Sequence, residues 1–291
     1  MEGAVVTAYA WPADARAALC VTFDLDAESP YIWRTRADPP ADVAELEQRR
    51  YGPRRGVEHL LAVLDRTATP ATFFVPGWVA TQHRNAVRDV VAAGHELALH
   101  GWCHEPPDQL TPDELRATLR RARDVIGDLA GRAPRGYRSP SWRMTPTALD
   151  VLAELGLAYD SSLMGDDRPY DVGGLVEIPV DWTTDDAVHY RYTGHGERAP
   201  VAPQLVVDSW RDELAGARDH GALVMLTMHP WISGRPARAH RLEQLLHEAH
   251  GLDDLWIGTA GALADHHTDL PHSAQRTRVA RDEIGRPDDD R

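Results

Sequence analysis

The first strand of the fold is predicted from residues 18–28, which read ALCVTFDLDAE. Residues 18–23 form an apolar run with β-branched and aromatic members, which is typical of a buried strand. Three acids then stand at alternate positions, Asp24, Asp26 and Glu28. A strand that is buried along its length and acidic at its carboxyl end predicts a functional site at that end.

Strand-like and helix-like segments alternate along the rest of the chain. Further strands are predicted at residues 71–75, 95–99, 135–137, 176–180, 222–228 and 255–257. Helices are predicted at residues 56–64, 81–93, 111–130, 145–155, 206–217 and 235–250. Repeated β-then-α units indicate an α/β fold with mostly parallel strands covered by helices, in a sheet that is open or closed into a barrel. In such barrels the active site lies at the carboxyl ends of the strands.

The composition excludes several classes of protein. The chain has 291 residues, of which 43% are hydrophobic and 26% charged, and this suits one large α/β domain or two small ones. A formal net charge of −14 argues against nucleic acid and anionic membranes as partners. Two cysteines, Cys20 and Cys103, are too few for a disulfide framework and are expected to be reduced thiols. The first residues show no signal-peptide pattern and no stretch could span a bilayer, so we expect a cytoplasmic protein.

Two segments lack a regular pattern. Residues 28–52 are rich in Pro, Arg and Asp and are predicted to be an irregular functional loop. Residues 268–291 contain few apolar side chains and end in PDDDR, which predicts a polar, disordered tail. We therefore expect one catalytic domain over residues 1–267.

Two further predicted strands end in histidines, with HGWCHE at residues 100–105 and TMHP at residues 227–230. His100 and His104 stand four apart and can reach one metal ion from a helical turn, while Cys103 between them is interpreted as a spacer. A carboxylate from a neighbouring strand end would complete a three-ligand site. A chance pair among 15 histidines and solvated acids are the alternatives. The presence of both features on adjacent strand ends favours the metal site.

Five motifs resemble those of the polysaccharide deacetylase family, which is also called carbohydrate esterase family 4. They are TFDLD at residues 22–26, HELALHGWCHE at residues 95–105, GYRSPSW at residues 136–142, EIPVDW at residues 177–182 and MLTMHP at residues 225–230. The first motif carries one residue inserted between its two aspartates. The match runs in the family's order from about Leu19 to about Ala264. It implies a distorted (β/α) barrel and a metal-dependent hydrolase of C–N bonds.

Details of these motifs are similar to one branch of the family, which holds cytoplasmic peptidoglycan-deacetylase-like proteins and cyclic imidases. The similar segments are FDLDAE, GWCHE, YDSSLM at residues 159–164, Asp185 with Asp186, and HP at residues 229–230 with Arg235 and Pro236. Allantoinases are relatives of this branch. The resemblance implies a small cyclic imide or amide as the substrate. N-deacetylation of amino sugars or peptidoglycan-type substrates is the alternative.

The resemblance also implies a role for each matching residue. A divalent metal, most often zinc, with cobalt or manganese as alternatives, would be bound by Asp26, His100 and His104. Asp24 would be the general base, oriented by Arg138, and His229 would be the general acid.

Four further residues are assigned to the substrate pocket: Glu28, Trp142, Trp182 and Asp186. Core packing is the alternative for the tryptophans. The acids could instead support the binding residues from behind or be solvent-exposed. Trp33 and the 28–52 segment are expected to roof the site. A binding module without activity and a metal-free allantoinase-like enzyme are further alternatives, and the intact metal set argues against both. The resemblance finally implies a homo-dimer or homo-tetramer.

Overall fold

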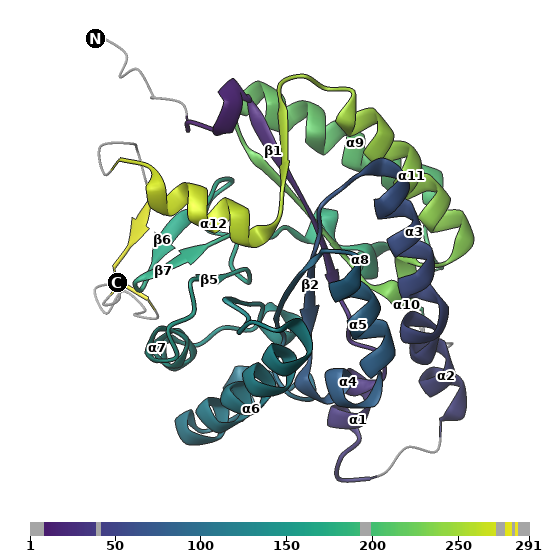
Figure 1. Ribbon diagram of the computed structural model, residues 1–291, viewed down its shortest axis with the longest axis vertical. Helices are drawn as coiled ribbons and strands as arrows, with labels where there is room; N and C mark the ends of the chain where they lie inside the picture. The colour runs from purple at the N-terminus through teal and green to yellow at the C-terminus, as the bar shows by residue number, and fades with distance from the viewer. Residues whose placement is uncertain (1–8, 39–41, 193–198, 272–276, 281–282, 285–291) are drawn as a thin grey trace, which may run out of the picture.

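The chain builds one mostly parallel sheet that curls into a half-barrel (Figure 1). The computed structural model describes residues 9–38, 42–192, 199–271, 277–280 and 283–284. The strands in them are β1 (Ala17–Asp24), β2 (Thr72–Val75), β3 (Glu96–Leu99), β4 (Gly136–Tyr137), β5 (Tyr159–Asp160), β6 (Tyr170–Val172), β7 (Leu175–Glu177), β8 (Leu223–Met228), β9 (Leu255–Gly258) and β10 (Arg278–Val279). Their order is β10-β6-β7-β5-β4-β3-β2-β1-β8, and β9 also pairs with β1. Among the described strands, β6 and β7 alone pair antiparallel.

Helices cover the outside of the sheet. They are α1 (Ser29–Arg34), α2 (Val43–Tyr51), α3 (Val57–Thr67), α4 (Gly77–Gln82), α5 (Arg84–Ala92), α6 (Pro112–Ala130), α7 (Pro146–Glu154), α8 (Asp186–Tyr190), α9 (Pro203–His220), α10 (Pro230–Ser233), α11 (Pro236–His250) and α12 (Ala260–Asp269). Single turns form η1 (Pro12–Asp14), the π-helical η2 (Gly52–Gly56), η3 (Pro107–Gln109), η4 (Pro140–Trp142) and η5 (Trp182–Thr184). Helices α3, α11 and α9 pack in a row beside β1 (Figure 1). In α3 the buried residues Val57, Leu60 and Leu64 recur at helical spacing and face the core.

Strand β1 pairs with β2, β8 and β9, and its two faces meet different parts of the core. Leu19 and Val21 belong to the apolar cluster that the strand shares with α3, α9 and α11. Ala18 and Cys20 belong to a second cluster, formed with residues of the other strands on the inside of the half-barrel. Side chains alternate along a strand with a period of two, so Asp24 shares the inner face. The first acid of the predicted site therefore points into the barrel.

The segment after β7 returns to the far edge of the sheet. Asp185 forms an isolated parallel bridge with Thr227 of β8. The hydroxyl of Thr184 donates to the carbonyl oxygen of Met225 at 2.6 Å. This return partly closes the barrel, and it carries Asp186 to the carboxyl end of β8.

The predicted α/β class with mostly parallel strands is confirmed. Each of the seven predicted strands has a counterpart, although β7 ends at Glu177, three residues earlier than predicted. The elements that were not predicted are β5, β6 and β10 and helices α1, α2, α8, α10 and α12. Most of them are too short to show a period in the sequence.

The excursion at residues 28–52 is mostly helical, so the prediction of an irregular loop was wrong. Helices α1 and α2 occupy much of it, and η2 joins α2 to α3. Pro30 lies in the first turn of α1, and the Asp42 side chain accepts hydrogen bonds from the backbone N–H groups of Ala44 and Glu45 at the start of α2. Proline and aspartate begin helices as readily as they form loops, and this explains the error.

The helix predicted at residues 81–93 is two helices, α4 and α5, which meet at His83. His83 Nε2 lies 2.9 Å from Glu28 Oε2, so the break places the imidazole against the excursion.

The described part of the predicted tail is ordered against the sheet. Strand β10 pairs with β6, and Val279 and Ile284 pack on the main core, because these two side chains are apolar. Helix α12 also runs past residue 267, where the catalytic domain was predicted to end. The rest of the predicted tail lies outside the described residues. No helix in the described ranges has the length and apolar character needed to cross a bilayer.

Candidate active site

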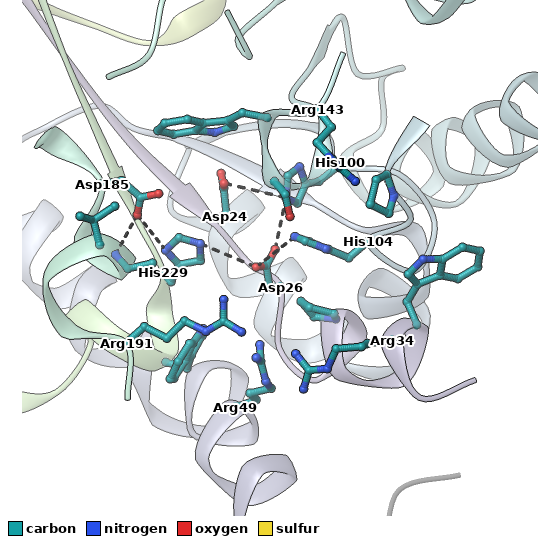
Figure 2. Close-up of a pocket in the computed structure, with 18 of the residues that line it drawn as sticks. Asp24, Asp26, Arg34, Arg49, His100, His104, Arg143, Asp185, Arg191 and His229 are labelled. Atoms are coloured by element: carbon teal, nitrogen blue, oxygen red, sulfur yellow. Dashed lines mark hydrogen bonds and ion pairs between the residues drawn. The ribbon is translucent and has the colours of Figure 1, made fainter. Parts of the chain in front are cut away.

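The carboxyl ends of neighbouring strands bring the predicted site residues together (Figure 2). Asp24 is the last residue of β1, and Asp26 follows two residues later. His100 directly follows β3, and His229 directly follows β8. His104 belongs to the turn that leaves β3. Because these strands are parallel, their carboxyl ends meet at one edge of the sheet.

Asp26, His100 and His104 form a cluster whose ligand atoms lie within 4.8 Å of one another. Asp26 Oδ1 is 3.3 Å from His100 Nε2, and Asp26 Oδ2 is 3.6 Å from His104 Nε2. Oδ1 is buried, yet it accepts no hydrogen bond from any residue that the structure describes. A buried carboxylate oxygen without a donor, facing two imidazole nitrogens, fits a divalent cation.

The orientation of His100 is fixed by its second ring nitrogen. Nδ1 lies 2.7 Å from the carbonyl oxygen of Arg138. Because a carbonyl only accepts, Nδ1 carries a proton, and Nε2 is the ring nitrogen that faces Asp26.

The two histidines are joined by a tight turn and not by the helical turn that the spacing suggested. Gly101 and His104 both have positive φ, +72° and 61° respectively. The Glu105 carboxylate accepts hydrogen bonds from the backbone N–H groups of Trp102, at 2.7 Å, and Cys103, at 2.5 Å. Glu105 therefore holds the shape of the turn, while the Cys103 thiol points to the carbonyl oxygen of Ser29 and away from the cluster.

The charges of the cluster shift its pKa values. Burial by itself raises the pKa of Asp26, but the positive charges of His104 and His100 outweigh burial and lower it. Burial lowers the pKa of His104 to about 4, although Asp26 acts in the opposite direction. These shifts favour an ionised aspartate and a neutral His104, which are the forms that bind cations.

Asp24 is held by a buried arginine. Arg138 Nη1 donates to Asp24 Oδ1 at 2.8 Å and to Thr22 Oγ1 at 2.9 Å. Its Nε and Nη2 donate to the carbonyl oxygen and the hydroxyl of Ser161, both at 3.0 Å. The guanidinium also lies over the ring of Phe74, 4.0 Å from its centroid. Every direction around Arg138 is occupied, so Asp24 is fixed in place where it lines the pocket.

His229 is held in the same way by a carboxylate. Its Nδ1 lies 2.7 Å from Asp186 Oδ1, and its backbone N–H donates to Asp186 Oδ2 at 2.9 Å. Burial lowers the pKa of His229, but the charge and hydrogen bond of Asp186 outweigh burial and raise it to about 10. The other ring nitrogen, Nε2, lies 3.7 Å from Asp26 Oδ2. A protonated nitrogen therefore faces the cluster.

Several residues of the site have a strained backbone conformation. Seven described residues other than glycine have positive φ, and four of them lie in or beside the motifs: Ala27 (47°), His104 (61°), Ser141 (56°) and Trp142 (53°). The other three, Ala13, Asp14 and Ala68, lie elsewhere. Such conformations cost about 1–3 kcal/mol each and persist where packing enforces them. Their concentration here is typical of a functional site.

The cluster opens into a pocket of about 740 Å³. Trp142 and Trp182 pack together on its wall, with ring centroids 4.2 Å apart. Trp33 of α1 also lines it, so the excursion forms part of the wall. Of the four predicted pocket residues, Trp142 and Trp182 line this space.

Glu28 and Asp186 are not among the residues that line the pocket. Glu28 is buried and accepts a hydrogen bond from Arg50 Nε at 3.1 Å, beside its contact with His83, so it ties α2 and α4 together. Asp186 is fully buried behind His229. Its neighbour Asp185 is the acid that reaches the pocket, and burial raises the pKa of Asp185 to about 7.

The five arginines of the pocket wall were missed: Arg34, Arg36, Arg49, Arg143 and Arg191. The abundance of arginine in residues 28–52 was visible in the sequence. That these arginines line the pocket depends on the fold of α1 and α2, which was not predicted from the sequence.

The fold and the site together define a class of protein: a distorted (β/α) barrel with carboxylates and histidines at the carboxyl ends of its strands. A family model described as "Polysaccharide deacetylase" matches residues 51–159. A solved structure from Mycobacterium smegmatis, described as a polysaccharide deacetylase, is 36% identical, with a TM-score of 0.85 over 94% of this chain and 98% of that chain. The chain belongs to the polysaccharide deacetylase family, which confirms the predicted family and barrel type.

Two further relatives carry different names. The "Peptidoglycan deacetylase" of Helicobacter pylori is 27% identical over 278 residues, which are 83% of this chain and 93% of the relative. The solved structure of Puue allantoinase has a TM-score of 0.78 at 22% identity, over 90% of this chain and 94% of that chain. The second likeness shows a shared fold.

Proposed function

We propose that the chain is a metal-dependent hydrolase that cleaves a non-peptide C–N bond in a small cyclic imide or amide. One observation carries the proposal. The cluster of Asp26, His100 and His104 lies between two further pairs, a carboxylate held by an arginine (Asp24 and Arg138) and an imidazole held by a carboxylate (His229 and Asp186). Hydrolysis of an amide-type bond needs a group that takes a proton from water and a group that gives one to nitrogen.

The cluster would hold the cation with one carboxylate and two imidazoles, which leaves positions for water and substrate. A divalent ion held there would supply Lewis-acid polarisation of the scissile carbonyl and a lowered pKa for a water molecule. Zinc is the ion that we expect, with cobalt or manganese as alternatives, because nitrogen and oxygen donors suit all three.

Asp24 is the general base in this proposal. Its Oδ1 accepts from Arg138, so its Oδ2 is the oxygen that is free to take a proton from water. Oδ2 lies 3.8 Å from His100 Nε2, next to the cluster. The two aspartates of the first motif then have different roles: Asp26 binds the cation, and Asp24 accepts a proton from water.

His229 is the general acid. Its Nδ1 is bound to Asp186, which leaves Nε2 as the donor toward the pocket. An amide nitrogen is a poor leaving group unless it is protonated, so a proton delivered from this side completes the reaction.

The shape of the pocket supports a small substrate. Helix α1 and the pair of Trp142 and Trp182 contribute to its wall. The cavity of about 740 Å³ has room for a small ring, which the aromatic side chains can pack against. Similarity to a protein named allantoinase agrees with a small cyclic substrate.

N-deacetylation of an amino sugar is the second candidate. The M. smegmatis and H. pylori relatives are named polysaccharide deacetylase and peptidoglycan deacetylase respectively. The same residues would serve this reaction, because an acetamide presents the same carbonyl and nitrogen.

Substrate assays test the proposal. The protein, loaded in turn with zinc, cobalt and manganese, is assayed with succinimide, dihydrouracil and chitooligosaccharides, and Asp24→Asn is the control for contaminating activity. We expect ring opening of at least one cyclic substrate and little acetate release. Robust acetate release without ring opening would favour the second candidate.

A further inference from the structure

Three arginines line one wall of the pocket. Arg34 comes from α1, Arg49 from α2, and Arg191 directly follows α8. Figure 2 shows their guanidinium groups on the same side of Asp26. They lie in the same cavity as the cluster, and this excess of positive charge stands in a chain whose formal net charge is −14.

Their positive charges exceed the negative charge that the protein supplies beside them. Glu45 is shared by two of them: it accepts from Arg34 Nη2 at 2.9 Å and from Arg49 Nη2 at 2.9 Å. The guanidinium of Arg191 has no hydrogen bond or ion pair with any residue in the described ranges. Arg34 and Arg49 therefore share the Glu45 carboxylate, and Arg191 has no carboxylate partner among the described residues.

Arg49 is placed at a cost in free energy. Its side chain is only 3% exposed, and its guanidinium lies 5.2 Å from the centroid of the Trp231 ring. Burial lowers the pKa of Arg49, the hydrogen bond that Arg49 donates to Glu45 raises it, and the like charge of Arg191 lowers it again. A buried cation beside a second cation is favourable when a further anion joins them.

We infer that the substrate carries a carboxylate, which the wall of Arg34, Arg49 and Arg191 binds while the scissile carbonyl lies at the cluster. This inference rests on the proposed function and names a feature of its substrate. Guanidinium groups form strong, charge-assisted hydrogen bonds with carboxylates. The Glu45 carboxylate already accepts such bonds from both Arg34 and Arg49. The arginines would then fix which carbonyl of a ring reaches the catalytic residues.

The test compares matched ligands that differ by one carboxylate. Dihydrouracil and its 6-carboxylate, dihydroorotate, form the cyclic pair, and N-acetylglucosamine and N-acetylmuramic acid form the acetamide pair. Calorimetry on the zinc-loaded protein measures the Kd of each ligand, and turnover is recorded separately. We expect the carboxylate member of at least one pair to bind more tightly by about tenfold or more, because a charge-assisted hydrogen bond contributes that much.

Arg191→Gln is the decisive variant, since this exposed side chain has no ion pair with a described residue whose loss could unfold the protein. It should reduce the carboxylate preference by about tenfold. Arg55→Gln, an exposed arginine outside this pocket, is the matched control and should leave both Kd values unchanged. Equal binding of both members in both pairs, or an equal loss for both members in Arg191→Gln, would overturn the inference. Tight binding of the carboxylate ligands without turnover would count against the proposed function and leave the inference standing.

Discussion

Arg138 and Asp24 form an ion pair that is almost fully enclosed, with 2.8 Å between Nη1 and Oδ1 and side-chain exposures of 0% and 5%. The pair links the third motif of the sequence to the first. The carbonyl oxygen of Arg138 also accepts a hydrogen bond from His100 Nδ1, so a single residue positions both a predicted base and a predicted metal ligand. The site is therefore one connected network.

Arg138→Gln should destabilise the protein strongly. It leaves Asp24 buried without its partner, and breaking a buried pair costs about 3–5 kcal/mol. Urea unfolding measures the change in the free energy of unfolding. The matched control is Arg135→Gln, which breaks the exposed pair with Asp265 and should cost about 1 kcal/mol or less. Similar losses in the two variants would contradict the enclosed character of the Arg138 pair.

Asp186→Asn should lower kcat and leave the metal content unchanged. The variant keeps the size of the side chain but removes the charge that holds His229, so we expect a loss of at least about tenfold from a general acid that contributes ~10²–10⁴. Ser233→Ala removes only a hydrogen bond to Asp186 and should cost less. An active Asp186→Asn enzyme with an unaltered kcat would mean that His229 needs no positioning.

The Asp160 and Glu177 carboxyls should contribute stability that falls as the pH rises from about 4 to about 6. Burial raises the pKa of Asp160 to about 6, and burial together with the charge of Asp160 raises the pKa of Glu177. The folded chain then holds protons that the unfolded chain has released above about pH 4, so the free energy of unfolding decreases with pH in this window.

Asp160→Asn removes one of these titrating groups. The free energy of unfolding of this variant should decrease less steeply with pH. One titrating group contributes at most about 1.4 kcal/mol per pH unit to that decrease. Urea unfolding at several pH values measures it, with Asp113→Asn, a side chain that is 96% exposed, as the control. An unchanged slope in Asp160→Asn would show that this carboxyl is not the source.

The predicted homo-dimer or homo-tetramer remains a prediction, as does the cytoplasmic location. Light scattering at assay concentrations should give a mass that is a small multiple of 32.3 kDa. A monomer alone would contradict it.

The sequence predicted the strand that carries the acids and the order of the motifs because these are local properties. The apolar run before Asp24 and the spacing of His100 and His104 are visible without any tertiary contact. Since parallel strands end at one edge, the meeting of Asp26 with these histidines followed from the fold class.

The remaining parts of the site depend on contacts between distant segments. Asp186 reaches His229 only because the segment after β7 returns to β8, a connection of the fold that no period encodes. Glu28 turns away from the pocket because His83 and Arg50 bind it. The wall of Arg34, Arg49 and Arg191 exists only once α1, α2 and the end of α8 have folded together.

The central claim is tested most directly by the number of metal ions bound per chain, measured in the wild type and in two variants. Elemental analysis of the wild type, Asp24→Asn and Asp26→Asn, each purified without chelator, follows the division of tasks between the two aspartates. We expect about one divalent ion in the wild type and in Asp24→Asn, which should be inactive, and far less in Asp26→Asn. A metal-free wild type with full activity, or an Asp26→Asn variant that binds the ion as the wild type does, would contradict the account.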